Sequence, residues 1–466
     1  MTFFDRLTRR VRRQFLESSA LFLNILRWTV LATIVGVIVG LSTALFILLL
    51  HKSIHFMQQY PYYFAILPLG LLFSTYFIKF LAPQAEGHGT EKVIEAVHKR
   101  DGRMYALDAP VKLIATVVTI ATGGSAGKEG PAAQIGATLA SVFATLFRLS
   151  KNDRKKLVIC GISAGFAAVF STPVAGALFG VEVLFLGQIM YEVLLPSFVA
   201  GITAFQVSRW LGASYFWDPM TWSLEFSEAL FFQVILSGVV FGLVCILFIE
   251  ALRWGHKFFN NFNHVPFWKP VIGGLLLVGF GLLGADSGLG LGVDTLERAL
   301  SGEPTPWWAW IFKSFATGTT LGCGGSGGVI TPIFIVGASA GSVWGQIIGA
   351  DPSIFAALGM VALVSGCANT PIAASVMGIE LFGKAFGPYG ATVCVVAFLM
   401  TGYRGVYSSQ ILARQKVEIL TAPLNQPISS DATPSFDSDT QRHYMKFWHI
   451  LEDIWNWIRG VKFWRH

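Results

Sequence analysis

Long uncharged stretches recur along this sequence, separated by short polar segments. Residues 28–50, 158–179, 229–249 and 386–403 contain no Asp, Glu, Lys or Arg. An α-helix needs about 20 predominantly apolar residues to cross a bilayer. Each stretch therefore predicts a membrane-spanning helix.

A fifth uncharged stretch, residues 354–379, is interrupted by Gly366, Asn369 and Pro371. Such a pattern predicts a helix that stops inside the membrane. Broken helices are tolerated there only where the freed backbone groups line a cavity or pack on protein. We therefore expect an all-α membrane protein with tilted and broken transmembrane helices.

Composition excludes a soluble or disordered protein. Charged residues are 13% of the 466 residues, against about 25% in soluble proteins, while 53% are hydrophobic. The net charge of +7 is modest and spread along the chain, so no nucleic-acid partner is expected. The five cysteines lie in apolar or Gly-rich stretches without metal-ligand spacing. They predict buried free thiols, with no metal or cofactor.

The two ends of the chain are polar. Five arginines within residues 6–13 precede the first apolar stretch, so residues 1–27 are predicted to be cytoplasmic. That stretch is longer than a signal-peptide core and lacks a small-residue cleavage site, so no cleavage is expected. Residues 416–442 are rich in Pro, Ser and Asp and predict a cytoplasmic linker. Residues 443–466 predict an amphipathic helix, either on the membrane surface or packed on the protein.

An internal repeat divides the sequence. GSAGKEGPAAQIGATLAS at 124–141 matches GSGGVITPIFIVGASAGS at 325–342, at an offset of 201 (325 − 124). Two further pairs keep the order: 87–97 with 290–300, and 172–182 with 370–380. We infer two related membrane halves, 28–210 and 229–415, joined by a connector at 211–228. Such repeats are typical of transporters and channels, whose sites lie where broken helices of both halves converge.

The repeated segments are Gly-rich loops that lead into helices. Glycine allows close backbone approach, and the proline that follows favours a first helical turn. Free N–H groups and the positive end of the helix dipole attract anions there. The loops 87–89, 127–131 and 328–332 would together bind an anion weakly enough for it to leave.

Glu129 is an ionisable residue inside one of these loops. Its carboxylate is a tethered anion that can compete with a permeating one, and protonation would remove the competitor. The alternative is a structural salt bridge to Lys128 or another base.

These motifs resemble those of the CLC family of chloride channels and proton/chloride antiporters, over about residues 28–415. GKEGP at 127–131, GGVITP at 327–332 and GHGTE at 87–91 carry the resemblance, with the two repeated TP segments. The resemblance implies CLC-type inverted repeats, a homodimer with one pore per subunit, and both termini in the cytoplasm. It places the chain in the cell (inner) membrane, with chloride as its ligand and protons as a further candidate.

The resemblance also assigns site residues. Glu129 would be the gating glutamate, and backbone N–H groups around Gly130 and Ile330 would contact the anion. Tyr407 resembles the family's inner tyrosine, with Tyr403 or Ser408 as alternatives if the register slips. The full predicted anion-binding set is His88, Gly89, Lys128, Gly130, Val329, Ile330, Thr331 and Tyr407.

Three positions depart from the family pattern around the anion. His88 replaces the usual serine: its ring either donates an N–H to the anion or turns away. Glu91 replaces a proline, and Ile330 replaces a phenylalanine. The apolar constriction that the side chain of Ile330 forms is smaller than the one formed by phenylalanine. A fluoride-exporting branch also alters the loop at His88, although with asparagine, so fluoride ranks below chloride.

A fourth departure bears on mechanism. Antiporters of the family usually carry a second glutamate directly after the position of Glu182, but this chain has Val183. Valine cannot carry a proton, so we expect a passive channel, with the antiporter as the alternative. Glu182 and Glu380, which match in the repeat, are expected to act structurally at helix ends.

A membrane-embedded enzyme is the alternative from another class. The sequence contains no HExxH motif of a metal site, so an enzyme is not expected. The chain ends 51 residues after position 415 (466 − 415), which is too short for paired CBS modules. A prokaryotic source is therefore expected.

Overall fold

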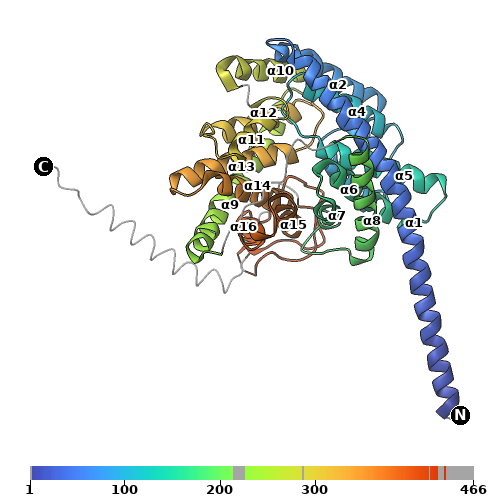
Figure 1. The fold of residues 1–466 in the computed structure, drawn as a ribbon. Coiled ribbons are helices and arrows are strands. Elements are labelled where there is room, and N and C mark those ends of the chain that lie inside the picture. The colour runs from blue at the N-terminus through green and yellow to red at the C-terminus, as the bar shows by residue number, and fades with distance from the viewer. Residues whose placement is uncertain (1–2, 214–225, 286–287, 419, 429–434, 437–466) are drawn as a thin grey trace.

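The computed structural model describes residues 3–213, 226–285, 288–418, 420–428 and 435–436 (Figure 1). Sixteen α-helices follow one another in these residues: α1 Phe3–Gln58, α2 Leu67–Leu81, α3 Thr90–Lys99, α4 Asp108–Ala121, α5 Glu129–Leu146, α6 Lys151–Phe170, α7 Pro173–Glu182, α8 Tyr191–Trp210, α9 Glu228–Asn260, α10 Trp268–Phe280, α11 Val293–Leu300, α12 Ala309–Gly322, α13 Ile330–Ile347, α14 Pro352–Ala368, α15 Pro371–Phe382 and α16 Gly387–Met400. Short 3-10 turns at Tyr63–Ile66, Pro83–Ala85 and Lys384–Phe386 and a π turn at Gly281–Ala285 connect some of them.

Four strands of two residues each complete the described elements. β1 (Phe185–Leu186) pairs in parallel with β2 (Ile411–Leu412). β3 (Leu420–Thr421) pairs with β4 (Ser435–Phe436) in antiparallel fashion, within the expected linker. The predicted C-terminal helix at 443–466 and residues 214–225 of the connector lie outside the described residues.

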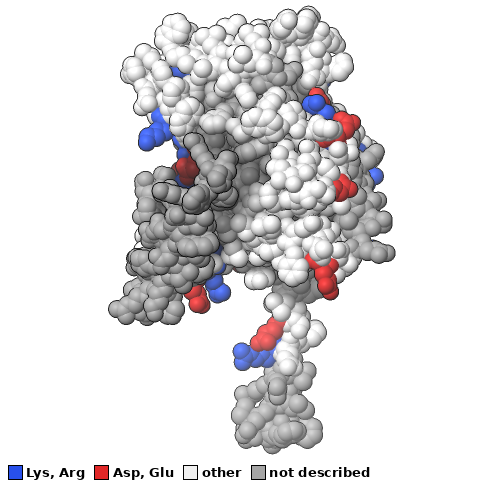
Figure 2. All heavy atoms as spheres, turned by 90° about the vertical axis from the view of Figure 1, so that its left-hand side faces the viewer, with Lys and Arg blue, Asp and Glu red and all other residues white. Residues whose placement is uncertain are grey.

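The surface of the helical body is apolar enough for a bilayer. Four helical segments of the described residues are long and apolar enough to cross a membrane: Arg13–Gln58, Tyr63–Leu81, Glu228–Asn260 and Ile330–Ile347. Charged side chains are sparse on the face shown in Figure 2. The predicted fold class, an all-α membrane protein with broken helices, is confirmed.

The first helix is much longer than its apolar stretch. α1 runs through the Arg-rich segment and the predicted span without interruption, and its N-terminal part projects from the body in Figure 1. The apolar stretch marks only the part suited to hydrocarbon. Good helix formers precede it, with no Gly or Pro before Gly36, so nothing ends the helix earlier.

Two predicted spans are broken at matching TP segments. Residues 158–179 do not form one helix, contrary to our prediction: α6 ends at Phe170, and Ser171 (φ 57°) precedes Thr172 and the first proline of α7. The predicted break within 354–379 is confirmed at Asn369 (φ 57°), directly before the TP of α15. A left-handed residue followed by X-Pro disfavours helix continuation.

The two halves anchor each other's Gly-rich loops. Ser125 in the α4–α5 loop donates its backbone N–H to the hydroxyl of Thr320 in α12 at 3.0 Å. The repeat-related contact joins Ser326 in the α12–α13 loop to Thr119 in α4 at 3.2 Å. Two hydrogen bonds between side-chain hydroxyls, Ser125–Thr317 (3.0 Å) and Thr116–Ser326 (2.9 Å), join the same loops and helices.

Glu182 at the end of α7 and Glu380 in α15 each bind the start of the other half's helix. The Glu182 carboxylate accepts the N–H groups of the second and third residues of α15, at 3.1 and 2.8 Å. Glu380 accepts those of the same positions in α7, at 3.0 and 2.8 Å. Each carboxylate thus satisfies free donors at the start of the other half's helix, and the expected structural role at helix ends is confirmed. All five cysteines are buried and free, as predicted.

Candidate anion-binding site

The three Gly-rich loops meet at one place. Gly127 and Gly328 exchange two backbone hydrogen bonds, with N···O distances of 2.7 and 2.6 Å, which joins the loops of the two halves. Gly89 (φ +82°) lies against the start of α5, where a Cβ atom on it would come within 2.4 Å of the Gly130 carbonyl oxygen. Only glycine fits that position. The starts of α3, α5 and α13 are therefore close together, as the repeat analysis expected.

The carboxylate of Glu129 lies on the start of α13. It accepts the backbone N–H of Thr331 at 3.1 Å and the Thr331 hydroxyl at 2.6 and 2.7 Å. Glu129 is fully buried, and a Cβ atom on Gly127 would lie 2.7 Å from its Oε2 atom. A negative group therefore occupies a helix N-terminus that is suited to an anion.

Lys128 directly precedes Glu129 in the chain, and Val329 and Ile330 directly precede Thr331. The Lys128 ammonium is buried and interacts electrostatically with Glu129, while the carboxylate still reaches Thr331. Val329 and Ile330 are buried apolar residues beside the Glu129 seat, so their backbone is the polar part they can offer to an anion.

His88 faces a histidine from the other half. Its Nε2 atom lies 3.4 Å from the Nε2 of His256 in α9, with the ring planes 55° apart. Its Nδ1 atom is buried without a hydrogen-bond partner among the described residues. Nδ1 is therefore the atom that His88 has available for an anion. Sequence reasoning missed His256 because the contact spans 168 positions and belongs to no motif.

Two buried lysines that the sequence analysis overlooked hold the glycine loops. The Lys112 ammonium donates to the carbonyls of Ala85 (3.1 Å) and Gly87 (2.6 Å), in the segment before α3. Lys313 donates to Gly288 (3.3 Å) and Gly290 (2.8 Å), before α11. Both lysine side chains are fully buried. Their offset of 201 (313 − 112) equals that of the main repeat, and this signal could have identified them.

Tyr407 lies on the α3 side of the site. Its hydroxyl is buried and makes no hydrogen bond of standard geometry with the described residues. The Thr90 hydroxyl and the carboxylates of Glu91 and Glu129 are near enough to interact with it.

The two alternatives to Tyr407 are engaged elsewhere. The Tyr403 hydroxyl lies within hydrogen-bond distance of the Leu420 carbonyl oxygen (2.8 Å) and of Gln415 Oε1 (2.6 Å), either of which can accept its proton. The Ser408 hydroxyl donates to Glu91 at 2.7 Å. The geometry favours Tyr407 among the three.

Val183 is a buried apolar residue at the end of α7. Its carbonyl accepts the side-chain N–H of Gln410 at 2.8 Å. The preceding residue, Glu182, has its carboxylate on the start of α15.

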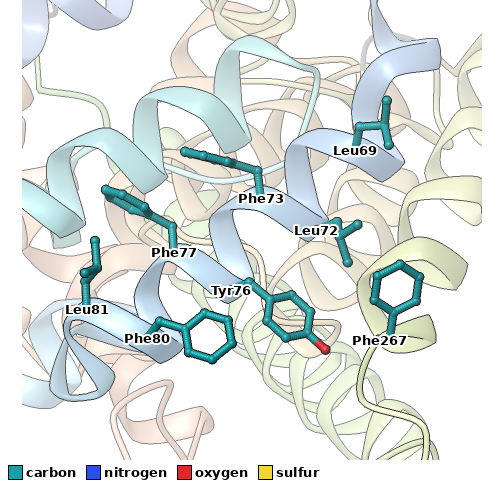
Figure 3. Close-up of a pocket in the computed structure, with 8 residues that line it drawn as sticks. All are labelled: Leu69, Leu72, Phe73, Tyr76, Phe77, Phe80, Leu81 and Phe267. Carbon is teal, nitrogen blue, oxygen red and sulfur yellow. The ribbon is translucent and has the colours of Figure 1, made fainter.

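An apolar groove lies away from this site. It is lined by side chains of α2 together with Phe267, as Figure 3 shows: Leu69, Leu72, Phe73, Tyr76, Phe77, Phe80, Leu81 and Phe267. None of the predicted site residues lines it. Its composition suits contact with lipid rather than with an anion.

Comparison with known proteins identifies relatives over most of the chain. The sequence pattern of the family described as "Voltage gated chloride channel" matches residues 70–402. A "Chloride/fluoride channel protein" of Pseudomonas syringae pv. tomato is 34% identical over 399 residues, covering 84% of this chain and 88% of that protein. A "Voltage-gated ClC-type chloride channel ClcB" of Escherichia coli is 29% identical over 333 residues, covering 68% of this chain and 78% of that protein.

A solved structure shares the fold. The crystal structure of a CLC-type fluoride/proton antiporter aligns with a TM-score of 0.79 and 28% identity, covering 84% of this chain and 98% of that one. A slow cyanobacterial Cl−/H+ antiporter aligns with a TM-score of 0.71 at 20% identity, covering 80% of this chain and 94% of that one, which supports the fold alone.

Proposed function

Because this chain belongs to the CLC family of voltage-gated chloride channels, whose sequence pattern covers residues 70–402, we propose that it is a passive channel for chloride and similar small anions, gated by Glu129. The anion would pass between the starts of α3, α5 and α13. His88, Gly89, Lys128, Gly130, Val329, Ile330, Thr331 and Tyr407 would surround it.

The seat of Glu129 is the observation that carries this proposal. The carboxylate takes two donors of Thr331, which are the groups that an anion at the start of α13 would use. Anion and carboxylate therefore compete for the same donors. When Glu129 leaves or is protonated, the donors become available to the anion.

The residues after α7 support passive conduction. Val183 cannot take up a proton, and the Glu182 carboxylate is engaged at α15. The position where antiporters of the family usually have a glutamate therefore holds a side chain that cannot carry a proton.

Proton-coupled exchange is the second candidate. The solved fluoride/proton antiporter aligns with 84% of this chain, and the name of the Pseudomonas relative includes fluoride. Both facts make fluoride and proton coupling alternatives that the experiment must separate from chloride conduction.

We further propose a homodimer in the cell (inner) membrane, with one pore per subunit and both termini cytoplasmic. The resemblance to the family supports the dimer and the termini. The Arg-rich start of α1 supports a cytoplasmic N-terminus by the positive-inside rule.

Anion efflux from liposomes tests this function. Purified protein is reconstituted, and internal chloride or fluoride is released with a potassium shunt while external pH is recorded. Glu129→Gln is compared with Glu95→Gln, whose carboxylate forms only partly exposed ion pairs with Lys92 and Lys99.

A channel gives chloride efflux that requires the shunt and moves no protons, and Glu129→Gln changes its rate while Glu95→Gln does not. Proton uptake in fixed ratio to anion release would replace the channel with an antiporter. Fluoride efflux that exceeds chloride efflux would change the substrate. Absence of any anion flux would contradict anion transport altogether.

A further inference from the structure

We propose that Glu91 is a positioning residue that holds Tyr407 at the α3 end of the anion pathway. This inference rests on the proposed function and deepens it. Glu91 stands where the family pattern has a proline, and nothing in the motif assigns it a task.

Glu91 binds the two residues that follow Tyr407. A single carboxylate oxygen, Oε1, accepts the Ser408 hydroxyl at 2.7 Å, the Ser409 hydroxyl at 2.6 Å and the Ser409 backbone N–H at 2.9 Å. These contacts join positions 317 and 318 residues apart in the chain. Hydrogen bonds to a charged group are stronger than neutral ones, so the three contacts form a firm tie.

The rest of the Tyr407 loop is tied to other elements. Val406 donates its N–H to the Cys367 carbonyl at 2.9 Å. The Gln410 side chain donates to the carbonyls of Val183 (2.8 Å) and Ala368 (2.9 Å). These bonds fix the loop to the ends of α7 and α14. The carboxylate of Glu91 joins the Tyr407 loop to α3. His88 and Gly89 directly precede that helix.

Tyr407 itself shows why its placement matters. Its side chain is only 1% exposed, yet its hydroxyl has no partner of standard geometry among the described residues. The Thr90 hydroxyl, one residue before Glu91, is likewise buried and makes no hydrogen bond of standard geometry with the described residues. The two hydroxyls are near enough to interact with each other, and an anion bound beside them would give each a stronger, charge-assisted partner. Glu91 sets how far apart the α3 start and Tyr407 lie.

The chemistry of Glu91 suits such a tie better than proline does. A proline at the same place has no side-chain acceptor for the serines. A negative charge in the first turn of α3 is also favourable for the helix dipole. Three donors on Oε1 reduce the repulsion that this charge would exert on a nearby anion.

The experiment measures the ratio of chloride to nitrate efflux from liposomes. The variants are Glu91→Ala, Glu91→Gln, Tyr407→Phe and the double variant Glu91→Ala with Tyr407→Phe. The amide oxygen of glutamine can still accept the serine donors, whereas alanine cannot. Glu95→Gln, one turn along α3, where the carboxylate forms ion pairs with Lys92 and Lys99, is the matched control.

We expect Glu91→Ala and Tyr407→Phe to shift the ratio in the same direction by about threefold or more, from the loss of hydrogen bonds. Glu91→Gln and Glu95→Gln should stay near the wild-type ratio. The double variant should shift no further than Tyr407→Phe alone, because Glu91 acts through the Tyr407 hydroxyl.

Three outcomes overturn the proposal. In the first, Glu91→Ala leaves the ratio unchanged while Tyr407→Phe shifts it. In the second, the shifts multiply in the double variant. In the third, Glu91→Gln behaves like Glu91→Ala, which would assign the effect to charge or to proton transfer instead of position.

Failure of the tie is distinguishable from failure of the proposed function. Wild-type protein that transports chloride and responds to Glu129→Gln keeps the proposed function, whatever Glu91→Ala does. If Glu91→Ala does not fold, the double variant Ser408→Ala with Ser409→Ala removes two donors from the other side. It should shift the ratio in the direction of Tyr407→Phe, and an unchanged ratio would reject the tie.

Discussion

Thr331 donates both its backbone N–H and its hydroxyl to the carboxylate of Glu129, at 3.1 Å and 2.6–2.7 Å. The two residues belong to different halves of the chain, 202 positions apart. The donors of α13 that suit an anion are therefore occupied by a tethered carboxylate. Conduction through this site depends on how readily the carboxylate leaves Thr331.

Thr331→Val should make the gate easier to open. The substitution removes the hydroxyl donor and keeps the backbone N–H and the side-chain shape. A hydrogen bond to a charged group is worth about 1.5–3 kcal/mol, so we expect anion efflux at neutral pH to rise by about tenfold or more. The measurement is chloride efflux from liposomes at matched protein density.

Thr331→Ser is the control for that variant, because it keeps the hydroxyl. It should retain the wild-type rate. Equal rates in Thr331→Val and Thr331→Ser would mean that the hydroxyl does not hold Glu129 closed.

Glu129→Gln should remove the response of conduction to external pH. In the wild type, protonation neutralises the carboxylate and weakens its hold on the Thr331 donors, so efflux should increase as pH falls. Glutamine imitates the neutral form at every pH. Its efflux should therefore be nearly constant across a pH series that starts near the ordinary glutamate pKa of about 4.3 and extends to neutral pH.

The outcome that contradicts this prediction is a pH response that persists in Glu129→Gln. Another titratable group would then control the anion pathway. The His88–His256 pair, with its 3.4 Å contact, would be the first to substitute.

The fold was predictable to the extent that it follows from local pattern and repetition. Uncharged stretches located the membrane helices, and the repeated segments located the loops that Gly127 and Gly328 join. The break at Ser171 was missed because the stretch 158–179 carries no charge, and hydropathy does not register a left-handed residue before Thr-Pro. The matching TP at 370–371 was sufficient to predict it by analogy.

The site was only partly predictable. Glu129 and Tyr407 belong to motifs, so their neighbourhoods could be inferred from resemblance. The partner of Glu129, the tie between Glu91 and Ser409, and the contact of His88 with His256 arise from tertiary packing across more than 160 positions. No local periodicity records such pairs.

Lys112→Met should weaken anion binding. The buried Lys112 side chain satisfies the carbonyls of Ala85 and Gly87 beside the α3 start and so holds the loop that leads into that helix. Its loss leaves both carbonyls unpaired, at about 1–3 kcal/mol for an unsatisfied buried group. We expect chloride affinity, measured by calorimetry on the purified protein, to fall by about tenfold.

Lys99→Met is the matched control, because Lys99 lies on α3 with its side chain 63% exposed. It should leave chloride affinity unchanged. If Lys112→Met retains wild-type affinity while its thermal stability drops, the lysine supports the loop without contributing to anion binding.

The hydrogen bonds of Glu182 and Glu380 to the starts of α15 and α7 predict an effect on protein stability that is separate from conduction. Each carboxylate accepts two N–H groups at the start of the other half's helix. Replacing either with alanine should cost about 1–2 kcal/mol, as for the loss of a helix cap, and should lower the unfolding temperature of the purified protein. Glutamine keeps one acceptor oxygen, so Glu182→Gln and Glu380→Gln should fall between alanine and the wild type. Because the two glutamates occupy equivalent places in the repeat, their alanine variants should lower the unfolding temperature by similar amounts.

The chloride-to-nitrate ratio and the pH response should remain those of the wild type in both glutamine variants. A pH response that changes in Glu182→Gln but not in Glu380→Gln would show that Glu182 carries protons as well as capping α15, and would favour the antiporter over the channel.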